Sequence, residues 1–122
     1  VLAEADFVSL HCPGGADNRH LIDASRLAAM KPGAFLINTA RGDVVDEPAL
    51  VDALATRRIA GAGLDVFAGE PEVPEALKRM DNVVLLPHLG SATAETREAM
   101  GMKVVENVTA FFEGGAVPDR VA

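Results

Sequence analysis

The stretch that decides the fold is residues 33–66, "GAFLINTARGDVVDEPALVDALATRRIAGAGLDV". It begins with an apolar run at 34–38 and ends with a second one at 61–66, and an amphipathic segment at 47–57 separates them. Neither run alternates with polar residues, as a strand with one face in water would. Asp46 can cap the amphipathic segment as a helix. Strand, helix and strand in this order predict a right-handed parallel crossover.

The same pattern continues on both sides of this stretch. Apolar runs at 6–10 and 83–86 predict two more strands, and a helix is expected at 24–30, after the capping residue Asp23. Residues 67–82 are interpreted as a polar, proline-containing connector. A longer amphipathic helix is expected at 94–113. Its apolar stripe repeats at spacings of three and four and consists of Met100, Val104, Val108, Phe111 and Phe112.

Composition narrows the function classes. The chain has 122 residues, 49% of them hydrophobic, which is enough for one core, and its net charge of −7 argues against binding to nucleic acid or to an anionic membrane. Cys12 is the only cysteine, which rules out an intrachain disulfide and fits a cytoplasmic location. No apolar run reaches the length of a membrane span. The chain opens at Val1 almost within a strand, so we interpret it as a piece of a larger protein.

Ligands of open parallel sheets bind beyond the carboxyl ends of the strands. Four loops follow the four predicted strands, "HCPGG" at 11–15, "TARG" at 39–42, "DVFAGEP" at 65–71 and "PHLGSAT" at 87–93. We therefore expect one edge of the sheet to carry the candidate functional side chains, which are His11, Cys12, Thr39, Arg41, Asp65, Glu70, His88 and Ser91.

Three of these residues form a plausible acid–base set. A histidine titrates near neutral pH, and a carboxylate held against its ring stabilises the charged form and selects the tautomer. An arginine binds a carboxylate with two parallel hydrogen bonds. Arg41, Glu70 and His88 could therefore perform acid–base chemistry on an anionic substrate.

Other chemistries are less favoured. A metal site is not expected, because His11 and His88 lie in different loops without the close spacing of common zinc motifs, and an arginine would repel the cation. Nucleophilic catalysis by Cys12 or Ser91 would need an adjacent base, which the sequence cannot place.

Each candidate also has a structural explanation. Arg41 could be a surface ion-pair partner, His88 a packing histidine and Glu70 a loop carboxylate. Asp65 could cap nearby backbone amides, and His20 is interpreted as a surface residue. Residue types alone do not decide between these explanations and a functional site.

Four blocks of the sequence closely resemble the D-isomer-specific 2-hydroxyacid dehydrogenases, in the branch of glyoxylate, hydroxypyruvate and 2-ketogluconate reductases. The blocks are "ADFVSLHCP", "MKPGAFLINTARGDVVDEPALVDAL", "IAGAGLDVFAGEP" and "NVVLLPHLGSATAETREAM". Their spacing also matches, with 70 − 41 = 29 positions from the arginine to the glutamate and 88 − 70 = 18 from the glutamate to the histidine. The resemblance covers the chain almost from end to end.

The resemblance implies an α/β fold, the second half of a Rossmann-like doubly wound parallel sheet plus a long C-terminal helix. Residues 1–92 would form the C-terminal half of an NAD(P)-binding domain. Residues 93–122 would be the long helix and a tail that returns to a substrate domain. The glycine-rich fingerprint of the family, and the residue that selects NAD or NADP, would lie before Val1.

The resemblance also implies an activity, the transfer of a hydride between a nicotinamide and a small 2-oxo or D-2-hydroxy acid such as glyoxylate or hydroxypyruvate. Arg41 would bind the substrate, His88 would donate or accept the proton, and Glu70 would support His88. The full-length protein would be a homodimer. The residues expected to line NAD or NADP are His11, Cys12, Pro13, Thr39, Ala40, Arg41, Asp65, His88, Gly90 and Ser91.

Three alternatives stay open. The chain could be a catalytically inactive fragment, because it lacks the rest of the cofactor site. It could be a corepressor-type module that senses a dinucleotide and binds proteins, although such a role needs none of the arginine, glutamate and histidine. A flavodoxin-like signalling module would need a phosphoacceptor cluster, which is not found. One departure from the family is Gly14-Gly15, where relatives usually have a leucine and a threonine.

Overall fold

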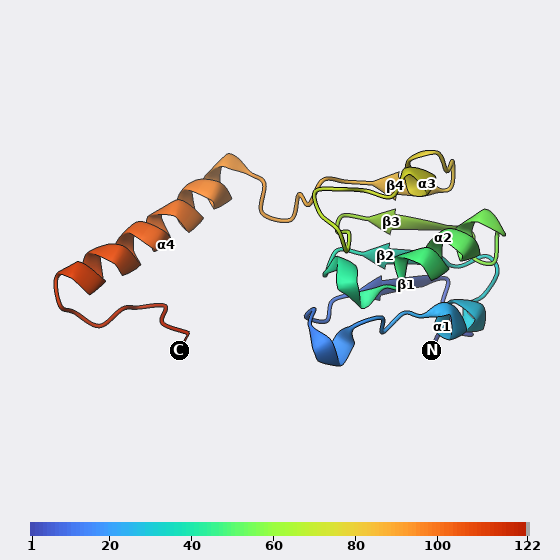
Figure 1. Ribbon diagram of the computed structural model, residues 1–122, viewed down its shortest axis with the longest axis horizontal. Coiled ribbons are helices and arrows are strands. Elements are labelled where there is room, and N and C mark those ends of the chain that lie inside the picture. The colour runs from blue at the N-terminus through green and yellow to red at the C-terminus, as the bar shows by residue number, and fades with distance from the viewer. Residues whose placement is uncertain (122) are drawn as a thin grey trace. The chain divides into compact units, whose positions relative to one another are not determined.

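The computed structural model describes residues 1–121, and the chain divides into two compact units between Leu89 and Gly90. In the first unit, four parallel strands form one sheet in the order β1-β2-β3-β4 (Figure 1). This confirms the predicted parallel sheet. Each strand is one or two residues shorter than predicted. The strands are β1 (Phe7–Leu10), β2 (Phe35–Asn38), β3 (Gly61–Leu64) and β4 (Val83–Leu85).

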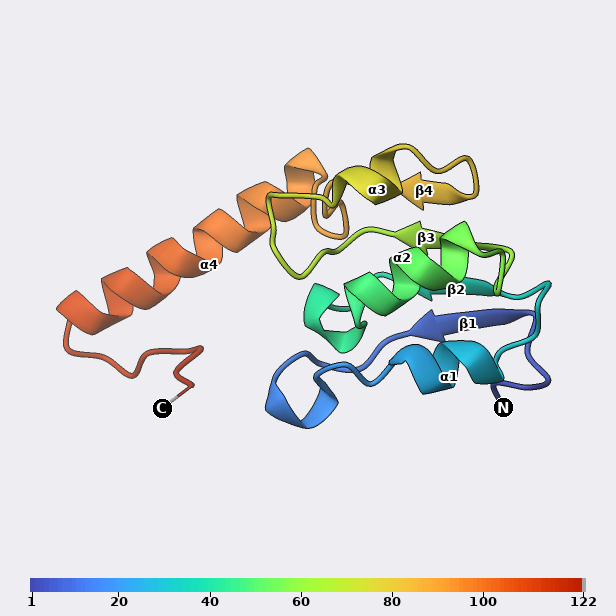
Figure 2. The ribbon, with the colours of Figure 1, turned by 45° about the vertical axis from the view of Figure 1, so that its right-hand side comes forward.

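Two capped helices cover one face of this sheet. Helix α1 (Ala24–Ala29) begins after Asp23, whose carboxylate accepts a hydrogen bond from Arg26 N at 2.8 Å. Helix α2 (Glu47–Ala55) begins after Asp46, whose carboxylate accepts from Ala49 N at 3.2 Å. Both caps are those predicted from the sequence. The two helices lie side by side on the same face in both ribbon views (Figures 1 and 2).

The core lies between these helices and the sheet. Because successive side chains of a strand point to opposite faces, alternate residues of each strand enter it. The opposite face carries Phe7 and Phe35, which stack with ring centroids 5.5 Å apart and are 69% and 39% exposed. Each strand of this sheet lies next to the one that precedes it in the sequence. Right-handed crossovers then place all connecting helices on the same side, which leaves the second face open. The largest core side chains are Leu27, Met30, Leu36, Leu50, Leu54, Ile59 and Leu77.

The connector at 67–82 is more ordered than predicted. It contains a one-turn helix, α3 (Glu75–Lys78), which was not predicted from the sequence. Pro74 precedes this turn, and Leu77 is buried beside the core of the first unit. Two short 3₁₀ turns also occur in the loops, η1 (Ala16–Asn18) and η2 (Gly42–Val44).

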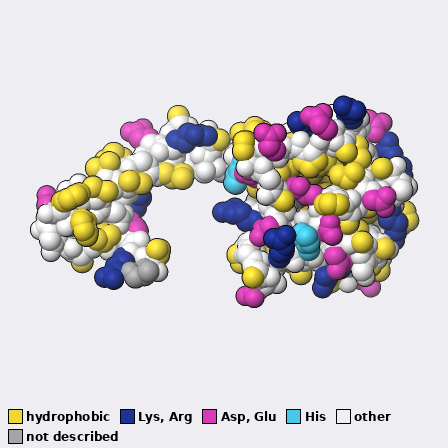
Figure 3. All heavy atoms as spheres, in the orientation of Figure 1, with side chains coloured by type: hydrophobic (Ala, Val, Ile, Leu, Met, Phe, Trp, Pro, Cys, Tyr) yellow, Lys and Arg dark blue, Asp and Glu magenta, His cyan; other side chains and the backbone are white. Residues whose placement is uncertain are grey.

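The second unit consists mainly of helix α4 (Ala94–Phe112), as predicted for 94–113. Thr93 caps its start, because the hydroxyl accepts from Thr96 N at 3.2 Å. The tail returns along the helix, where Asp119 N donates to Asn107 Oδ1 at 3.0 Å. The predicted apolar stripe of α4 is exposed, and Figure 3 shows apolar side chains along much of the helix. None of the helices formed by residues 1–121 is long and apolar enough to cross a membrane.

Candidate active site

Three parallel strands bring the predicted triad to one hollow. Arg41 follows β2, Glu70 lies in the loop after β3 and His88 follows β4. The hollow has a volume of about 580 Å³ and lies where the strand-end loops meet. Its lining consists of Gly14, Gly15, Arg41, Gly42, Asp43, Phe67, Ala68, Glu70 and His88.

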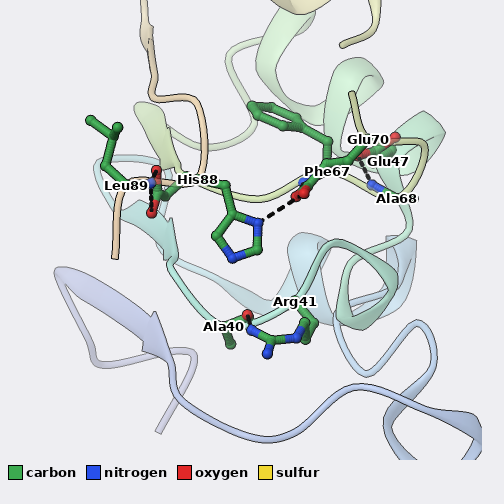
Figure 4. Close-up of polar contacts among 9 residues, drawn as sticks. Ala40, Arg41, Glu47, Phe67, Ala68, Glu70, His88 and Leu89 are labelled. Carbon is green, nitrogen blue, oxygen red and sulfur yellow. Dashed lines mark hydrogen bonds and ion pairs between the residues drawn. The ribbon is translucent and has the colours of Figure 1, made fainter. Parts of the chain in front are cut away.

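Glu70 orients the ring of His88. The distance from His88 Nδ1 to Glu70 Oε2 is 2.8 Å. Because an ionised carboxylate can only accept, Nδ1 carries the hydrogen and donates it. Nε2 then lies on the side of the ring toward Arg41 (Figure 4). The histidine therefore presents its second nitrogen to a ligand in the hollow.

The surroundings of Glu70 keep it ionised. Its second oxygen, Oε1, accepts a hydrogen bond from Phe67 N at 2.9 Å. The hydrogen bond from His88, followed by the one from Phe67, lowers the pKa of Glu70 below its ordinary value, and the charge of Arg41 acts in the same direction. The carboxylate can thus hold the imidazole tautomer across the neutral pH range.

The backbone at His88 is strained. Its φ is 55°, in the left-handed region that non-glycine residues rarely occupy. Asp65, which is only 6% exposed, supports this conformation from the end of β3. Its carbonyl oxygen accepts from His88 N at 2.9 Å, and its carboxylate oxygens accept from Leu89 N at 2.8 and 3.0 Å. Asp65 thus caps amides of the loop, as the structural alternative for this residue predicted. A contact between Asp65 and the cofactor stays a prediction.

Asn38 shapes the turn that presents Arg41. This side chain is 1% exposed; its Nδ2 donates to Arg41 O at 2.9 Å, and its Oδ1 accepts from Ala40 N at 3.0 Å. One Arg41 nitrogen donates to Ala40 O at 2.6 Å (Figure 4). Within residues 1–121 the guanidinium forms no ion pair, and its role in binding stays a prediction. Its other N–H groups are available to an anion.

Two contacts join the turn after β2 to the loop after β3. A Cβ at Gly42 would lie 2.0 Å from the carbonyl carbon of Phe67, so only glycine permits this approach. Glu47, in the first turn of α2, accepts from Ala68 N at 2.7 Å (Figure 4). Neither Glu47 nor Asn38 was predicted from the sequence. An acidic residue at a helix start is commonplace, but a polar residue that ends an apolar strand could have identified Asn38.

Besides Asp65 and His88, the residues predicted for the cofactor fall into two groups. His11, Cys12, Pro13, Thr39 and Ala40 line a second hollow of about 450 Å³, which Arg41 and Gly14 also line. Gly90 and Ser91 begin the second unit, and their role stays a prediction. Residues 1–121 contain no cluster of three or more His, Cys, Asp or Glu side chains placed to hold a metal.

Fold and site together define a parallel α/β domain of the dinucleotide-binding class with a hydrogen-bonded histidine–glutamate pair at its strand ends. A family model described as D-isomer specific 2-hydroxyacid dehydrogenase, NAD binding domain, matches residues 1–90, and the chain belongs to this family. The family predicted from the four sequence blocks is thereby confirmed.

Individual proteins and structures similar to this chain support the same family. A glyoxylate reductase of Thermococcus litoralis is 51% identical over 121 residues, which are 99% of this chain and 37% of that enzyme. A D-3-phosphoglycerate dehydrogenase of Mycobacterium leprae is 46% identical over 121 residues, 99% of this chain and 23% of the relative. The crystal structure of an NADPH-dependent glyoxylate/hydroxypyruvate reductase from Sinorhizobium meliloti, in complex with NADP and malonate, superimposes with a TM-score of 0.92 at 47% identity. It is matched over 99% of this chain and 38% of that one. The chain thus spans little more than a third of the reductases it matches.

Proposed function

We propose that this chain forms the catalytic edge of an NAD(P)-dependent D-2-hydroxyacid dehydrogenase that reduces small 2-oxo acids such as glyoxylate or hydroxypyruvate. The observation that supports this most directly is the 2.8 Å hydrogen bond between Glu70 and His88 in a hollow that Arg41 also lines. A proton donor, a fixed carboxylate and an anion-binding guanidinium are the groups that this reaction requires of the protein.

The chemistry of the second hollow fits a nicotinamide nucleotide. Its polar side chains are His11, Cys12, Thr39 and Arg41, and none of the described residues that line it is a carboxylate, so it suits amide and hydroxyl groups. It adjoins the triad, because Arg41 lines both hollows. When bound, NAD or NADP supplies the hydride chemistry of the reaction.

The protein side of the mechanism follows from the triad. Arg41 binds the carboxylate of the 2-oxo acid and fixes its orientation. His88 donates a proton from Nε2 to the 2-oxo oxygen as negative charge develops there. Glu70 accepts the Nδ1 hydrogen throughout and so stabilises the protonated ring before transfer. In the oxidation of a D-2-hydroxy acid, neutral His88 accepts the proton at the same atom.

The remaining assignments extend this proposal to the whole protein. Residues 1–92 would complete an NAD(P)-binding domain, and residues 93–122 would return to a substrate domain. We propose a homodimeric, cytoplasmic enzyme whose partners are its small-molecule substrates rather than nucleic acid or membranes. The net charge of −7 supports the last point.

Replacing His88 with glutamine tests the proton-transfer role in a full-length protein that contains this segment. His88→Gln keeps a polar side chain but cannot transfer the proton, so turnover with glyoxylate and hydroxypyruvate should fall by about two to four orders of magnitude. His20→Gln is a matched control, because His20 also has a left-handed backbone, with φ 52°, and does not line the hollow. If turnover falls equally in both variants, the loss comes from replacing a histidine with a left-handed backbone and not from the loss of proton transfer.

Replacing Arg41 with lysine tests substrate binding. Lysine keeps the charge but loses the planar pair of donors, so Arg41→Lys should raise the Michaelis constant for the 2-oxo acid and lower turnover. The affinity for the cofactor should change less. Arg79→Lys, at an exposed position, should leave these constants unchanged. If Arg41→Lys and His88→Gln both reduce the two substrates at the parent rate, the triad has a structural role and the proposal fails.

A further inference from the structure

A second carboxylate lies beside Arg41 in the hollow. Asp43 belongs to the 3₁₀ turn η2, two positions after Arg41, and lines the same hollow as Arg41 and His88. Its Oδ2 accepts a hydrogen bond from Gly15 N at 2.9 Å. Among residues 1–121, no donor bonds to its Oδ1. Asp43 therefore keeps one acceptor oxygen available at the wall of the site.

The wall next to this oxygen is bare backbone. A Cβ at Gly14 would lie 2.6 Å from Asp43 Oδ1 and 3.1 Å from Arg41 Cβ, so a side chain at this position would displace the carboxylate or the arginine. Gly15 has φ 101°, a conformation that favours glycine. His20 N also donates to Asp43 O at 2.8 Å, which ties the loop to the turn. The loop can therefore approach Asp43 this closely only because glycine occupies position 14.

The charges around the hollow are unbalanced. Of the described residues that line it, Arg41 is the single permanent cation, whereas Asp43 and Glu70 are both acidic. A 2-oxo acid uses the charge of Arg41 for its own carboxylate. A second anionic group on the substrate would then face Asp43 without a counter-charge from this chain.

We infer that Asp43 is a specificity-determining residue, which accepts a hydrogen bond from a hydroxyl on C3 of the 2-oxo acid and disfavours a phosphate or carboxylate there. This inference rests on the proposed reductase function and narrows its substrate class. Like charges repel, whereas a hydroxyl can donate to a free carboxylate oxygen. The preferred substrates are therefore monoanionic 2-oxo acids with a hydroxylated substituent.

The experiment compares three substrates in the cofactor-loaded, full-length protein, namely glyoxylate, hydroxypyruvate and 3-phosphohydroxypyruvate. Asp43→Asn removes the charge but keeps a carbonyl oxygen that can accept from Gly15 N, so the loop should remain in place. We expect kcat/KM for 3-phosphohydroxypyruvate, relative to hydroxypyruvate, to rise by about tenfold. The change should be smaller with glyoxylate, which has no C3, than with either three-carbon substrate.

A second variant tests the hydroxyl contact. Asp43→Ala removes every acceptor, so KM should rise several-fold for hydroxypyruvate and much less for glyoxylate. Asp52→Asn removes the same charge from a part of α2 that faces α1, and it should leave all three ratios unchanged.

Two results overturn the inference. If the parent reduces glyoxylate and hydroxypyruvate but both Asp43 variants keep the parent substrate ratios, Asp43 has no part in selectivity, and the reductase function still stands. If the parent reduces none of the three 2-oxo acids, the proposed function fails, and the inference fails with it.

Discussion

Glu70 shows how one side chain connects stability to the site. Its pKa is lowered from 4.5 by the hydrogen bonds of His88 and Phe67. A group with a lowered folded-state pKa contributes stability that is present above its unfolded pKa and is lost as the pH falls through the folded value. The contribution of Glu70 should therefore be complete at neutral pH and decline below about 4.5.

We expect Glu70→Gln to be less stable than the parent at about pH 6 and to approach the parent as the medium becomes more acidic. Denaturant unfolding of the 122-residue chain across this range measures the difference. Glu72→Gln, which changes a glutamate of the same loop without these bonds, serves as the control. A difference between Glu70→Gln and the parent that stays constant with pH would contradict the ionised hydrogen-bond network.

Glu47 acts on the site through the backbone of the neighbouring loop. Because its carboxylate accepts from Ala68 N at 2.7 Å, Glu47→Ala should leave that amide without its partner and cost about 1 kcal/mol. Glu47→Gln keeps a carbonyl acceptor and should retain most of the bond. Amide hydrogen exchange at Ala68, measured by NMR, should be faster in Glu47→Ala than in Glu47→Gln. Equal exchange in the two variants would mean that the bond does not hold the loop.

At the scale of elements, the site depends on the approach of the turn η2 to the loop after β3. Gly42→Ala would place a methyl group 2.0 Å from the carbonyl carbon of Phe67, and the backbone would have to move. We expect a loss of about 2 kcal/mol or more in the free energy of unfolding. Gly33→Ala is the matched control, because nothing lies within 4 Å of a Cβ there. Urea unfolding measures the free energy of unfolding of both variants. If the two variants are equally stable, the close approach of the two loops does not contribute to stability.

The strands illustrate a second feature at this scale. The same apolar runs that predicted four parallel strands also suggested burial on both faces, yet in the first unit Phe7 and Phe35 remain exposed on the face opposite α1 and α2. The apolar pattern therefore predicts strands that can be buried on both faces. In residues 1–89, however, the helices cover only one face of the sheet.

At the scale of the whole molecule, the chain presents two apolar surfaces, the open sheet face and the stripe of α4. Exposed apolar surface of this kind promotes association. We expect the 122-residue chain to self-associate with rising concentration and to bind a hydrophobic dye, as sedimentation and fluorescence would show. Changing Val104 and Val108 to glutamine should weaken both effects, whereas Glu98→Gln, a polar substitution on α4, should not. A chain that stays monomeric at high concentration and binds no dye would contradict this prediction.

The sequence by itself determined the four strands, the helices α1, α2 and α4, the parallel order of the strands and the edge at which the triad lies. These features depend on local signals, because apolar runs, capping residues such as Asp23 and Asp46, and the fixed hand of the crossover act over short stretches of chain. The short helix α3 could not be predicted in this way, because its one turn lies in a polar, proline-containing segment. Family resemblance supplied the roles of Arg41, Glu70 and His88, which periodicity could not provide.

Only the tertiary structure decided how the site is held. The bond between Glu70 and His88 spans 18 positions, and the bonds that Asp65 accepts from Leu89 N span 24. The bonds that Glu47 and Asp43 accept span 21 and 28. Such contacts depend on how separate loops pack against one another, and spacing along the chain does not encode their distance or direction. For that reason Asp43, Glu47 and the left-handed backbone of His88 became visible only when the loops were folded together.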